Sequence, residues 1–306
     1  MKKDTTVAYI ALAGICLIWG TTYLALRIAV LHFPPFLFTI IRQVIAGGLM
    51  LSFMTLVMRA PWPDRKLVIN HAIGGFFMIS IGNGLVAWAE MEIPSGIAAI
   101  LCSLMPVVVI LINLGIHREE RPSPMILLGV LFGMAGIVII FSDNLAAFSR
   151  PEYWMGIALI LIAVLGWAGG SLWIKRKHSD SNPFINAGIQ MFFGGIWLIP
   201  FSLLFDDLQS VSWSSEAFYA MIYLVVFGSI IAYASYLYAL RKLPMTIVSM
   251  YAYVNPVVAV LLGWLILNEN FNPVIGTGIL TTVLGIFLVN QGYRQGARKR
   301  ISVVRN

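Results

Sequence analysis

Arg42 is the one charged side chain that lies deep inside an apolar segment of this sequence. It comes about seven residues after the start of its segment, which is ~10 Å along a helix. A charge in apolar surroundings is expensive and usually faces a cavity or a partner. We consider two roles: Arg42 binds a solute carboxylate, or it holds neighbouring helices by donating to backbone carbonyls. Glu90 lies at the edge of another segment. If the two side chains formed an ion pair, the role of Arg42 would be structural.

Amide side chains offer further binding groups inside apolar segments. Asn83 stands between Gly82 and Gly84, which allow a helix or a ligand to approach closely. Its amide supplies both hydrogen-bond donors and acceptors. Gln190 occupies the position that matches Arg42 in the internal repeat described below, so the two matching positions differ in charge. Each amide either contacts a solute or makes a packing hydrogen bond.

Two prolines interrupt apolar segments near their middle. Pro256 lies 12 residues after Pro244, roughly 18 Å along a helix, and Pro106 holds the matching position in the first half. A helix-interior proline leaves the carbonyl four residues earlier without its donor. In a membrane such a group is tolerated where protein or a water-filled cavity satisfies it. The breaks, beside Ser103 and Asn255, predict a cavity between these segments; the alternative is a kink that only helps packing.

Aromatic residues also fall inside the apolar segments, although Trp and Tyr usually gather at the headgroup level. Trp19 and Trp167 lie near the middle of their segments, at matching repeat positions. As a group, the aromatics predict an amphipathic wall for an aromatic or mixed apolar and polar solute, whereas each one alone is better explained by core packing. The predicted wall consists of Trp19, Trp88, Trp167, Tyr233, Tyr236, Tyr238, Tyr251 and Tyr253.

Other chemistries are disfavoured. The four histidines lie at or near segment ends and share no spacing, so we expect no metal site. They are His32, His71, His117 and His178. No carboxylate lies in the middle of a segment, and no Walker-type phosphate loop occurs. We therefore expect no enzyme activity, no cofactor and no use of ATP. Ion coupling stays open, with Glu90 as its candidate residue.

The elements that must position these residues are membrane helices. The chain has 306 residues, of which 59% are hydrophobic and 11% charged, and its mean hydropathy is +0.88. No soluble globular class has this composition. Apolar runs of roughly 20 residues recur, each long enough to cross a hydrocarbon core of about 30 Å. We predict an all-α integral membrane protein, in contact with the lipid bilayer, with ten spans at 7–29, 35–58, 67–89, 94–116, 124–142, 153–174, 184–205, 214–240, 244–267 and 271–292.

The charges predict how these spans are oriented. The net charge is +7, and if the spans alternate in direction, 17 of the 20 Lys and Arg fall on the side of the termini. Eight of the 13 Asp and Glu fall on the other side. The positive-inside rule then places both termini in the cytoplasm. We interpret the basic C-terminal tail as a membrane-anchoring end and expect no nucleic-acid partner.

The two halves of the chain resemble each other. Trp167 follows Trp19 at an offset of 148, and Gln190 follows Arg42 at the same offset. The stretch 89–109 matches 239–259 at an offset of 150. Each half holds five predicted spans, an odd number, so the second half enters the membrane from the opposite side. We therefore predict two inverted five-helix repeats, at 1–145 and at 146–306 with its short basic tail.

Inverted repeats suggest a mechanism. Two similar halves can exchange conformations and open a central site first to one side of the membrane and then to the other. This predicts transport by alternating access; the alternative is that duplication only enlarged the bundle. Glycines recur at small-residue spacing in spans five and ten. These two spans therefore pack on each other or on a second copy of the chain in a homodimer.

Four motifs carry a resemblance to a known family: IWGTTYLALR (18–27), IPSGIAA (93–99), GSIIA (228–232) and YAYVNPVVAVLLG (251–263). Over nearly its whole length the chain resembles the EamA family of the drug/metabolite transporter superfamily, in its YedA-like branch. The resemblance implies a ten-helix exporter of the bacterial cytoplasmic (inner) membrane, with a central cavity lined by spans one to four and six to nine. Family substrates are amino acids and related metabolites, sometimes toxic cations.

From this resemblance we expect a secondary transporter that exports small metabolites, namely amino acids with apolar or aromatic side chains or related compounds. The alternatives are a passive channel or facilitator, a multidrug exporter of organic cations, and, last, a membrane scaffold or enzyme. A channel would show flux that solute on the opposite side does not stimulate. A scaffold would show no flux, and its Pro106 and Pro256 would be dispensable.

Overall fold

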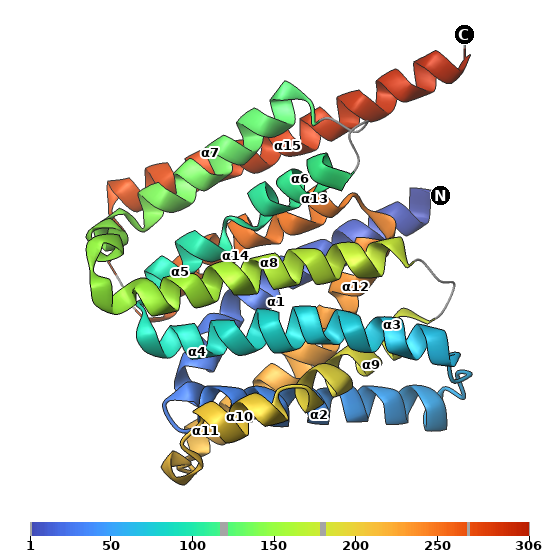
Figure 1. Cartoon of the computed structure of the whole chain (residues 1–306). Helices are drawn as coiled ribbons and strands as arrows, with labels where there is room; N and C mark the ends of the chain where they lie inside the picture. The colour runs from blue at the N-terminus through green and yellow to red at the C-terminus, as the bar shows by residue number, and fades with distance from the viewer. Residues whose placement is uncertain (1, 117–121, 178–181, 268–269, 306) are drawn as a thin grey trace.

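The computed structural model describes residues 2–116, 122–177, 182–267 and 270–305. Within these ranges every regular element is helical and no strand occurs. The helices form a single bundle, with the N- and C-terminal ends of the chain at the same end of it (Figure 1). We call this the termini end. The predicted all-α membrane fold is confirmed.

The first half contributes five helical segments, three of them divided into shorter helices. They are α1 (Lys2–Val30); α2 (Pro35–Ser52) with η1 (Phe53–Val57); α3 (Arg65–Gly75), η2 (Phe76–Gly84) and α4 (Leu85–Glu92); α5 (Ser95–Cys102) with α6 (Met105–Ile116); and α7 (Pro124–Ile140). Two short 3-10 turns, η3 (Ser142–Ser149) and η4 (Pro151–Tyr153), then lead into the second half.

The second half repeats this pattern, starting from the opposite end of the bundle (Figure 1). Its segments are α8 (Trp154–Arg176); α9 (Pro183–Ile196) with α10 (Ile199–Phe205); α11 (Ser215–Tyr223), η6 (Leu224–Ile231) and α12 (Ala232–Lys242); α13 (Met245–Ser249) with α14 (Tyr251–Leu267); and α15 (Pro273–Arg305). The short turn η5 (Leu208–Ser210) lies before α11.

Several helices begin at polar residues that cap them. Asp64 accepts a hydrogen bond from the backbone of Leu67 at 2.7 Å, and the Ser214 hydroxyl accepts one from Ala217 at 3.1 Å. These bonds satisfy backbone donors that a helix start leaves unpaired. At α9 the cap Asn182 is followed directly by proline, a residue that suits the first helical turn. Local sequence therefore determines where these spans begin.

Nine stretches of the described helices are long and apolar enough to cross a membrane. The remaining predicted span, α7, has 17 residues and reaches that length only together with η3, from which it is bent by 86°. At 1.5 Å per residue α7 is about 25 Å long, close to a hydrocarbon core of about 30 Å. The ten predicted spans thus correspond to nine full-length helical segments and one short one.

Two of the divided segments contain π-helix at equivalent places. The π-helix η2 starts at Phe76 and η6 starts at Leu224, an offset of 148 that matches the repeat. A π-helix turn is wider than an α-helix turn and is frequent at functional sites. These two segments are the ones that bring Asn83 and Ser229 to the centre of the bundle.

The helix breaks predicted at the two prolines lie upstream of them. In the first half α5 ends at Cys102 and α6 starts at Met105, so Pro106 is in the first turn of the new helix. In the second half the break is at Met250, and Pro256 lies inside α14. The two breaks are therefore not at equivalent repeat positions. At the offset of 150 that relates these stretches, Met250 corresponds to residue 100, whereas the break in the first half lies between Cys102 and Met105.

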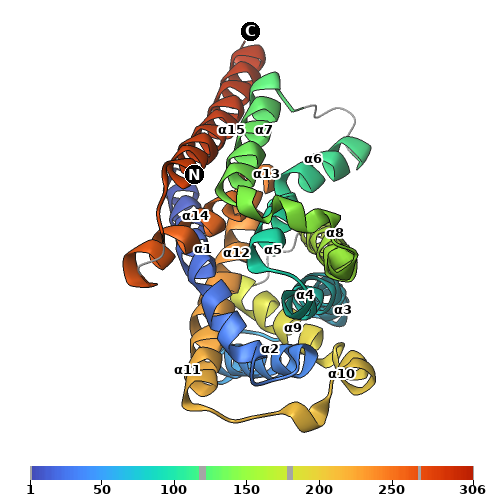
Figure 2. The same ribbon diagram turned by 90° about the vertical axis from the view of Figure 1, so that its left-hand side faces the viewer.

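The two halves pack across each other in matching pairs. Helix α2 lies against α9, α1 lies against α12, and α8 lies against η2 and α4. The α7–α15 pair forms a layer on one flank of the bundle (Figure 2). The backbones of this pair meet at Gly129, Gly136 and Gly285. Spans five and ten thus pack on each other within one chain.

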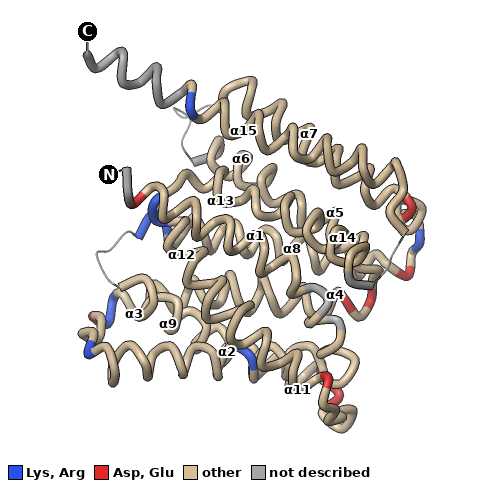
Figure 3. Tube along the Cα trace, turned by 180° about the vertical axis from the view of Figure 1, so that it is seen from behind, with Lys and Arg blue, Asp and Glu red and all other residues tan. Residues whose placement is uncertain are grey.

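Charged residues separate along the bundle. Lys and Arg gather at the termini end, and most Asp and Glu lie at the opposite end (Figure 3). At the termini end Lys242 and Asp4 form an ion pair of 3.7 Å between Nζ and Oδ2. At the other end Asp206 accepts from the backbone of Leu37 at 2.7 Å. This excess of Lys and Arg at one end of the bundle is the pattern on which the positive-inside rule is based.

Candidate functional site

A cavity of about 130 Å³ lies in the middle of the bundle, between the two halves. It is lined by α1, α2, η2, α4 and the α5–α6 segment of the first half, and by α8, η6, α12 and α14 of the second. Among its described lining residues none comes from α7, α9 or α15. Seven of the residues predicted for the site or its aromatic wall line it, namely Trp19, Arg42, Asn83, Trp167, Tyr233, Tyr251 and Asn255.

Arg42 supplies the charge of this cavity. Its Nε donates to the Ser229 hydroxyl of η6 at 2.8 Å, so the guanidinium reaches from the first half to the second. Arg42 is 9% exposed, and no acidic side chain pairs with it in the described part of the chain. Glu90, the partner considered from the sequence, is partly buried at the end of α4. A buried cation held by a neutral hydroxyl has donors left for an anion.

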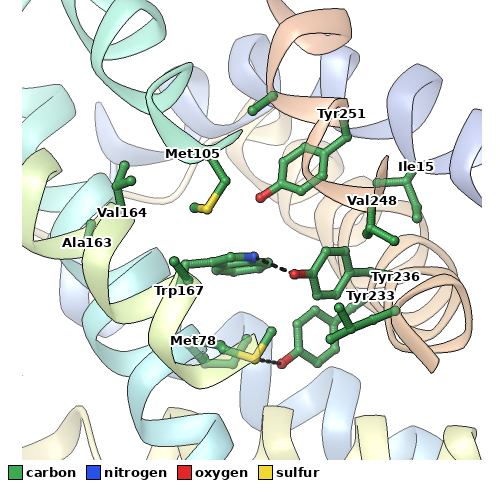
Figure 4. Packing of buried hydrophobic residues seen from close by; sticks show 14 of the residues in the cluster. Ile15, Met78, Met105, Ala163, Val164, Trp167, Tyr233, Tyr236, Val248 and Tyr251 are labelled. Carbon is green, nitrogen blue, oxygen red and sulfur yellow. Dashed lines mark hydrogen bonds between the residues drawn. The ribbon is translucent and has the colours of Figure 1, made fainter. Parts of the chain in front are cut away.

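Aromatic rings close the cavity toward the termini end. Trp19 and Trp167 meet edge to face with ring centroids 5.6 Å apart, and Tyr236 lies 5.5 Å from each of them. The Trp167 indole donates to the Tyr236 hydroxyl at 3.2 Å, and Figure 4 shows Tyr233 beside this pair. The Ser171 hydroxyl lies 2.7 Å from that of Tyr236. We call these four aromatic residues, Trp19, Trp167, Tyr233 and Tyr236, the aromatic floor.

Amides surround the cavity above this floor. Asn255 donates to the carbonyls of Cys16 at 3.2 Å and Tyr251 at 3.0 Å when its amide nitrogen faces them, so it ties α14 to α1. Gln43, next to Arg42, lines the cavity, and its buried Oε1 has no hydrogen-bond partner among the described residues. A buried acceptor without a donor costs about 1–3 kcal/mol. Gln43 is therefore ready to accept a donor that enters.

Beneath the aromatic floor, Gln190 joins two other buried side chains. Its Oε1 accepts from the Tyr233 hydroxyl at 2.7 Å, and its Nε2 lies 2.7 Å from His71 Nδ1. Gln190 is completely buried and does not line the cavity. The repeat partner of Arg42 thus has a different position and different contacts.

The remaining predicted site residues lie away from the cavity. Trp88 packs between Phe36 and Phe205, with ring centroids 5.4 and 5.2 Å from its own. The Ser103 hydroxyl donates to its own helix, at Ile100. Tyr253 points to the flank and donates to the Val130 carbonyl of α7 at 3.0 Å. Pro106 and Pro256 also do not line the cavity. The structure thus separates the site residues that face the cavity from those that pack between helices.

Three residues of this region have a place in the site that the sequence did not predict. Ser229 holds Arg42, Gln43 lines the cavity with an unpaired acceptor, and His71 bonds to Gln190. Ser229 lies in the GSIIA motif, which is the sequence feature that could have identified Ser229 as a site residue. His71 is the seventh residue of its helix, and for this reason the sequence pattern places it near the end of a segment and not in the site. Two of the other histidines, His117 and His178, lie outside the described residues.

Comparisons with known proteins agree with this architecture. The model of the EamA-like transporter family matches residues 6–142 and 154–291. The chain is 34% identical to the uncharacterized inner membrane transporter YedA of Escherichia coli K12, over 92% of this chain and 90% of that protein. It is 28% identical to an uncharacterized transporter of Archaeoglobus fulgidus, over 94% of this chain and 99% of that protein. A crystal structure with 21% identity has the same fold, with a TM-score of 0.75 over 96% of this chain and 99% of that one.

Proposed function

The chain belongs to the EamA-like transporter family and is a multi-pass membrane transporter, and from this premise we propose that it exports small amino-acid-like solutes by alternating access. The solute carries a carboxylate, an amino group and an apolar or aromatic part. Both termini lie in the cytoplasm, and the membrane is the bacterial inner membrane. The charge segregation along the bundle and the name of the Escherichia coli relative support this placement.

The observation that carries the proposal is Arg42 in the central cavity. It is the only charged residue among the described residues that line this cavity, and its one described partner is the Ser229 hydroxyl. Guanidinium and carboxylate pair through two parallel hydrogen bonds, which are strong where water is excluded. An anionic group of the solute would therefore find its counter-charge here. A cationic drug would meet repulsion instead.

The other lining groups fit the rest of such a solute. The unpaired Gln43 Oε1 would accept from an ammonium group next to a carboxylate bound by Arg42. The aromatic floor offers ring faces and edges to an apolar side chain. The volume of about 130 Å³ is close to the ~150 Å³ of a cavity that holds one benzene molecule. A small solute therefore fits this conformation, and a larger one requires the halves to move.

Alternating access is supported by the asymmetry of the cavity. The aromatic floor closes it toward the termini end, whereas its lining continues in the other direction as far as Leu26 and Val86. The two halves make matching contacts across the bundle. Exchange of their conformations would open the floor and close the opposite end. In the cell this would move solute from the cytoplasm outward.

The test is flux across proteoliposomes that contain the purified protein. Labelled amino acids and organic cations are measured one by one, with and without unlabelled solute on the opposite side. Saturable flux of amino acids that opposing solute accelerates is the expected result. Flux that opposing solute leaves unchanged would indicate a channel. Flux of cations alone would contradict the role of Arg42, and no flux of any amino acid would refute the substrate class.

A further inference from the structure

Three buried polar side chains form a continuous hydrogen-bonded path beneath the central cavity. Tyr233 of α12 donates to Gln190 of α9, and Gln190 in turn meets His71 of α3, with 2.7 Å at each step. Their exposed fractions are 2%, 0% and 5%. The path therefore crosses three helices and both halves of the chain, and its members are nearly inaccessible to solvent. Each of these three side chains can both donate and accept hydrogen bonds.

This path connects two hollows. Tyr233 lines the central cavity, and His71 lines a second pocket of about 40 Å³, which we call the termini-side pocket. The second pocket reaches Lys175 and Arg241, at the helix ends that approach the termini. Gln190 lines neither hollow and separates them. A change in hydrogen bonding at one hollow can thus affect the other through the side-chain amide of Gln190.

The direction of the hydrogen bonds determines the charge state of His71. The Gln190 amide uses its oxygen to accept from Tyr233, so its nitrogen faces His71 Nδ1. An amide nitrogen only donates, and Nδ1 must therefore accept. In this arrangement the imidazole is neutral and carries its proton on Nε2.

A protonated His71 is incompatible with this arrangement. Imidazolium has N–H donors at both nitrogens, so Nδ1–H would face the amide donors of Gln190. Turning the amide over restores both bonds, because Oε1 then accepts from His71 and Nε2 donates to the Tyr233 oxygen. The hydroxyl hydrogen of Tyr233 must then find another acceptor. The choices are Met78 Sδ, a weak acceptor at 3.7 Å, and a solute in the central cavity.

Among the described residues, the charged groups that line the termini-side pocket together with His71 are cations. They are Lys175 and Lys177 at the end of α8, and Arg241 of α12; Asn186 of α9 is the polar neutral neighbour. The described residues that line this pocket include no acid. A further positive charge is unfavourable there, whereas an anion in the pocket would compensate for it. Protonation of His71 is therefore expected to accompany the arrival of a carboxylate.

We propose that His71 is a proton-binding site that couples the termini-side pocket to the central cavity. The carboxylate group of a solute enters the termini-side pocket, His71 takes a proton from the water there, and Gln190 turns over. Tyr233 then offers its hydroxyl hydrogen to the central cavity. Proton and carboxylate strengthen each other's binding by the same factor. The identity of the solute rests on the proposed function, whereas the hydrogen-bond switch does not.

Nitrogen NMR of labelled histidine tests the switch without any transport. His32, His117 and His178 are replaced by Asn, so that the signals of His71 are the only ones. At pH 8 we expect a neutral ring with its proton on Nε2. Formate, the smallest carboxylate and therefore the probe that suits a pocket of about 40 Å³, should move the titration of His71 to higher pH, and Arg241→Gln should reduce this shift. A proton on Nδ1 at pH 8, or a titration that formate leaves unchanged, would overturn the proposal.

Flux provides the second readout. With an amino acid that the wild type transports, an imposed proton gradient should accelerate its flux in the direction in which protons flow. His71→Asn keeps a hydrogen-bonding amide near the position of Nδ1 but does not titrate, so its flux should persist and lose the acceleration. Equal acceleration in both proteins would overturn the proposal. Formate-dependent titration without flux of any amino acid would uphold the switch and refute the proposed function.

Discussion

Trp19 and Trp167, which occupy equivalent positions 148 residues apart in the two repeats, meet edge to face with ring centroids 5.6 Å apart. Each indole also donates to a helix of the second half, Trp19 to the Gly228 carbonyl at 2.9 Å and Trp167 to the Tyr236 hydroxyl at 3.2 Å. The pair therefore lies on the boundary between the halves. Any motion that separates the halves at the termini end has to break this contact.

The first prediction concerns the strength of this pair. Trp19→Leu and Trp167→Leu should each destabilise the protein, and the double variant should lose less than the sum of the two. Aromatic pairs of this geometry contribute about 0.5–1.5 kcal/mol beyond the area they bury. Equilibrium unfolding of the four proteins in detergent gives the coupling energy. Strict additivity would mean that the two rings do not interact.

Arg42→Gln should weaken binding of a carboxylate-bearing solute by roughly 10- to 100-fold, because hydrogen bonds to charged groups contribute about 1.5–3 kcal/mol. The change removes the charge and keeps hydrogen-bond donors. Arg42→Lys is the matched control, since it keeps the charge but loses the planar pair of donors, and an intermediate effect is expected. Solute binding is measured by calorimetry on folded, monodisperse protein. Unchanged binding and flux in Arg42→Gln would assign Arg42 a structural role only.

Gly285→Ala should disrupt the α7–α15 pair. A Cβ at this position would lie 2.6 Å from the Gly129 carbonyl oxygen and 2.7 Å from the Gly133 Cα, and neither backbone atom can yield easily. Overpacking of this kind costs about 1–3 kcal/mol. Gly276→Ala, on the same helix, is the control, because its Cβ would be no closer than 3.7 Å to the Phe271 ring. Thermal denaturation in detergent should separate the two variants, and equal melting temperatures would contradict the close packing.

Tyr253→Phe should lower stability and leave transport unchanged. The substitution removes the hydroxyl that donates to the Val130 carbonyl at 3.0 Å, which contributes about 0.5–1.5 kcal/mol. Tyr251→Ala is the informative contrast, since Tyr251 lines the cavity and lies 4.9 Å from Trp19 between ring centroids. Solute affinity should fall in that variant. A larger transport defect in Tyr253→Phe than in Tyr251→Ala would reverse this assignment.

The orientation of the chain is tested by labelling from outside intact cells. Lys66 and Asp207 are exposed at opposite ends of the bundle, and both native cysteines, Cys16 and Cys102, are replaced first. A membrane-impermeant maleimide should label Asp207→Cys and should label Lys66→Cys only after the cells are opened. The opposite pattern would place the termini outside.

The number of spans and their duplication were predictable from the sequence because both depend on local properties. A run of apolar residues must satisfy its own backbone in lipid, and a helix is the way to do this within one segment. The loop charges predict the orientation in the same way. The exact place of the helix breaks was not predictable from the prolines, since Pro256 is accommodated inside α14 and the chain turns at Met250 instead.

By itself, the sequence determined that this protein is a duplicated bundle of membrane helices with Arg42, Asn83 and paired tryptophans in its interior. Only the tertiary structure decided which of the polar residues share a cavity, because a polar side chain in an apolar helix has the same sequence signature whether it faces a cavity or a neighbouring helix. Tyr251 and Tyr253 show this, since they are two residues apart and point to the cavity and to α7. The link from His71 to Tyr233 joins residues of three helices. It exists only because packing of the halves brings them within hydrogen-bonding distance.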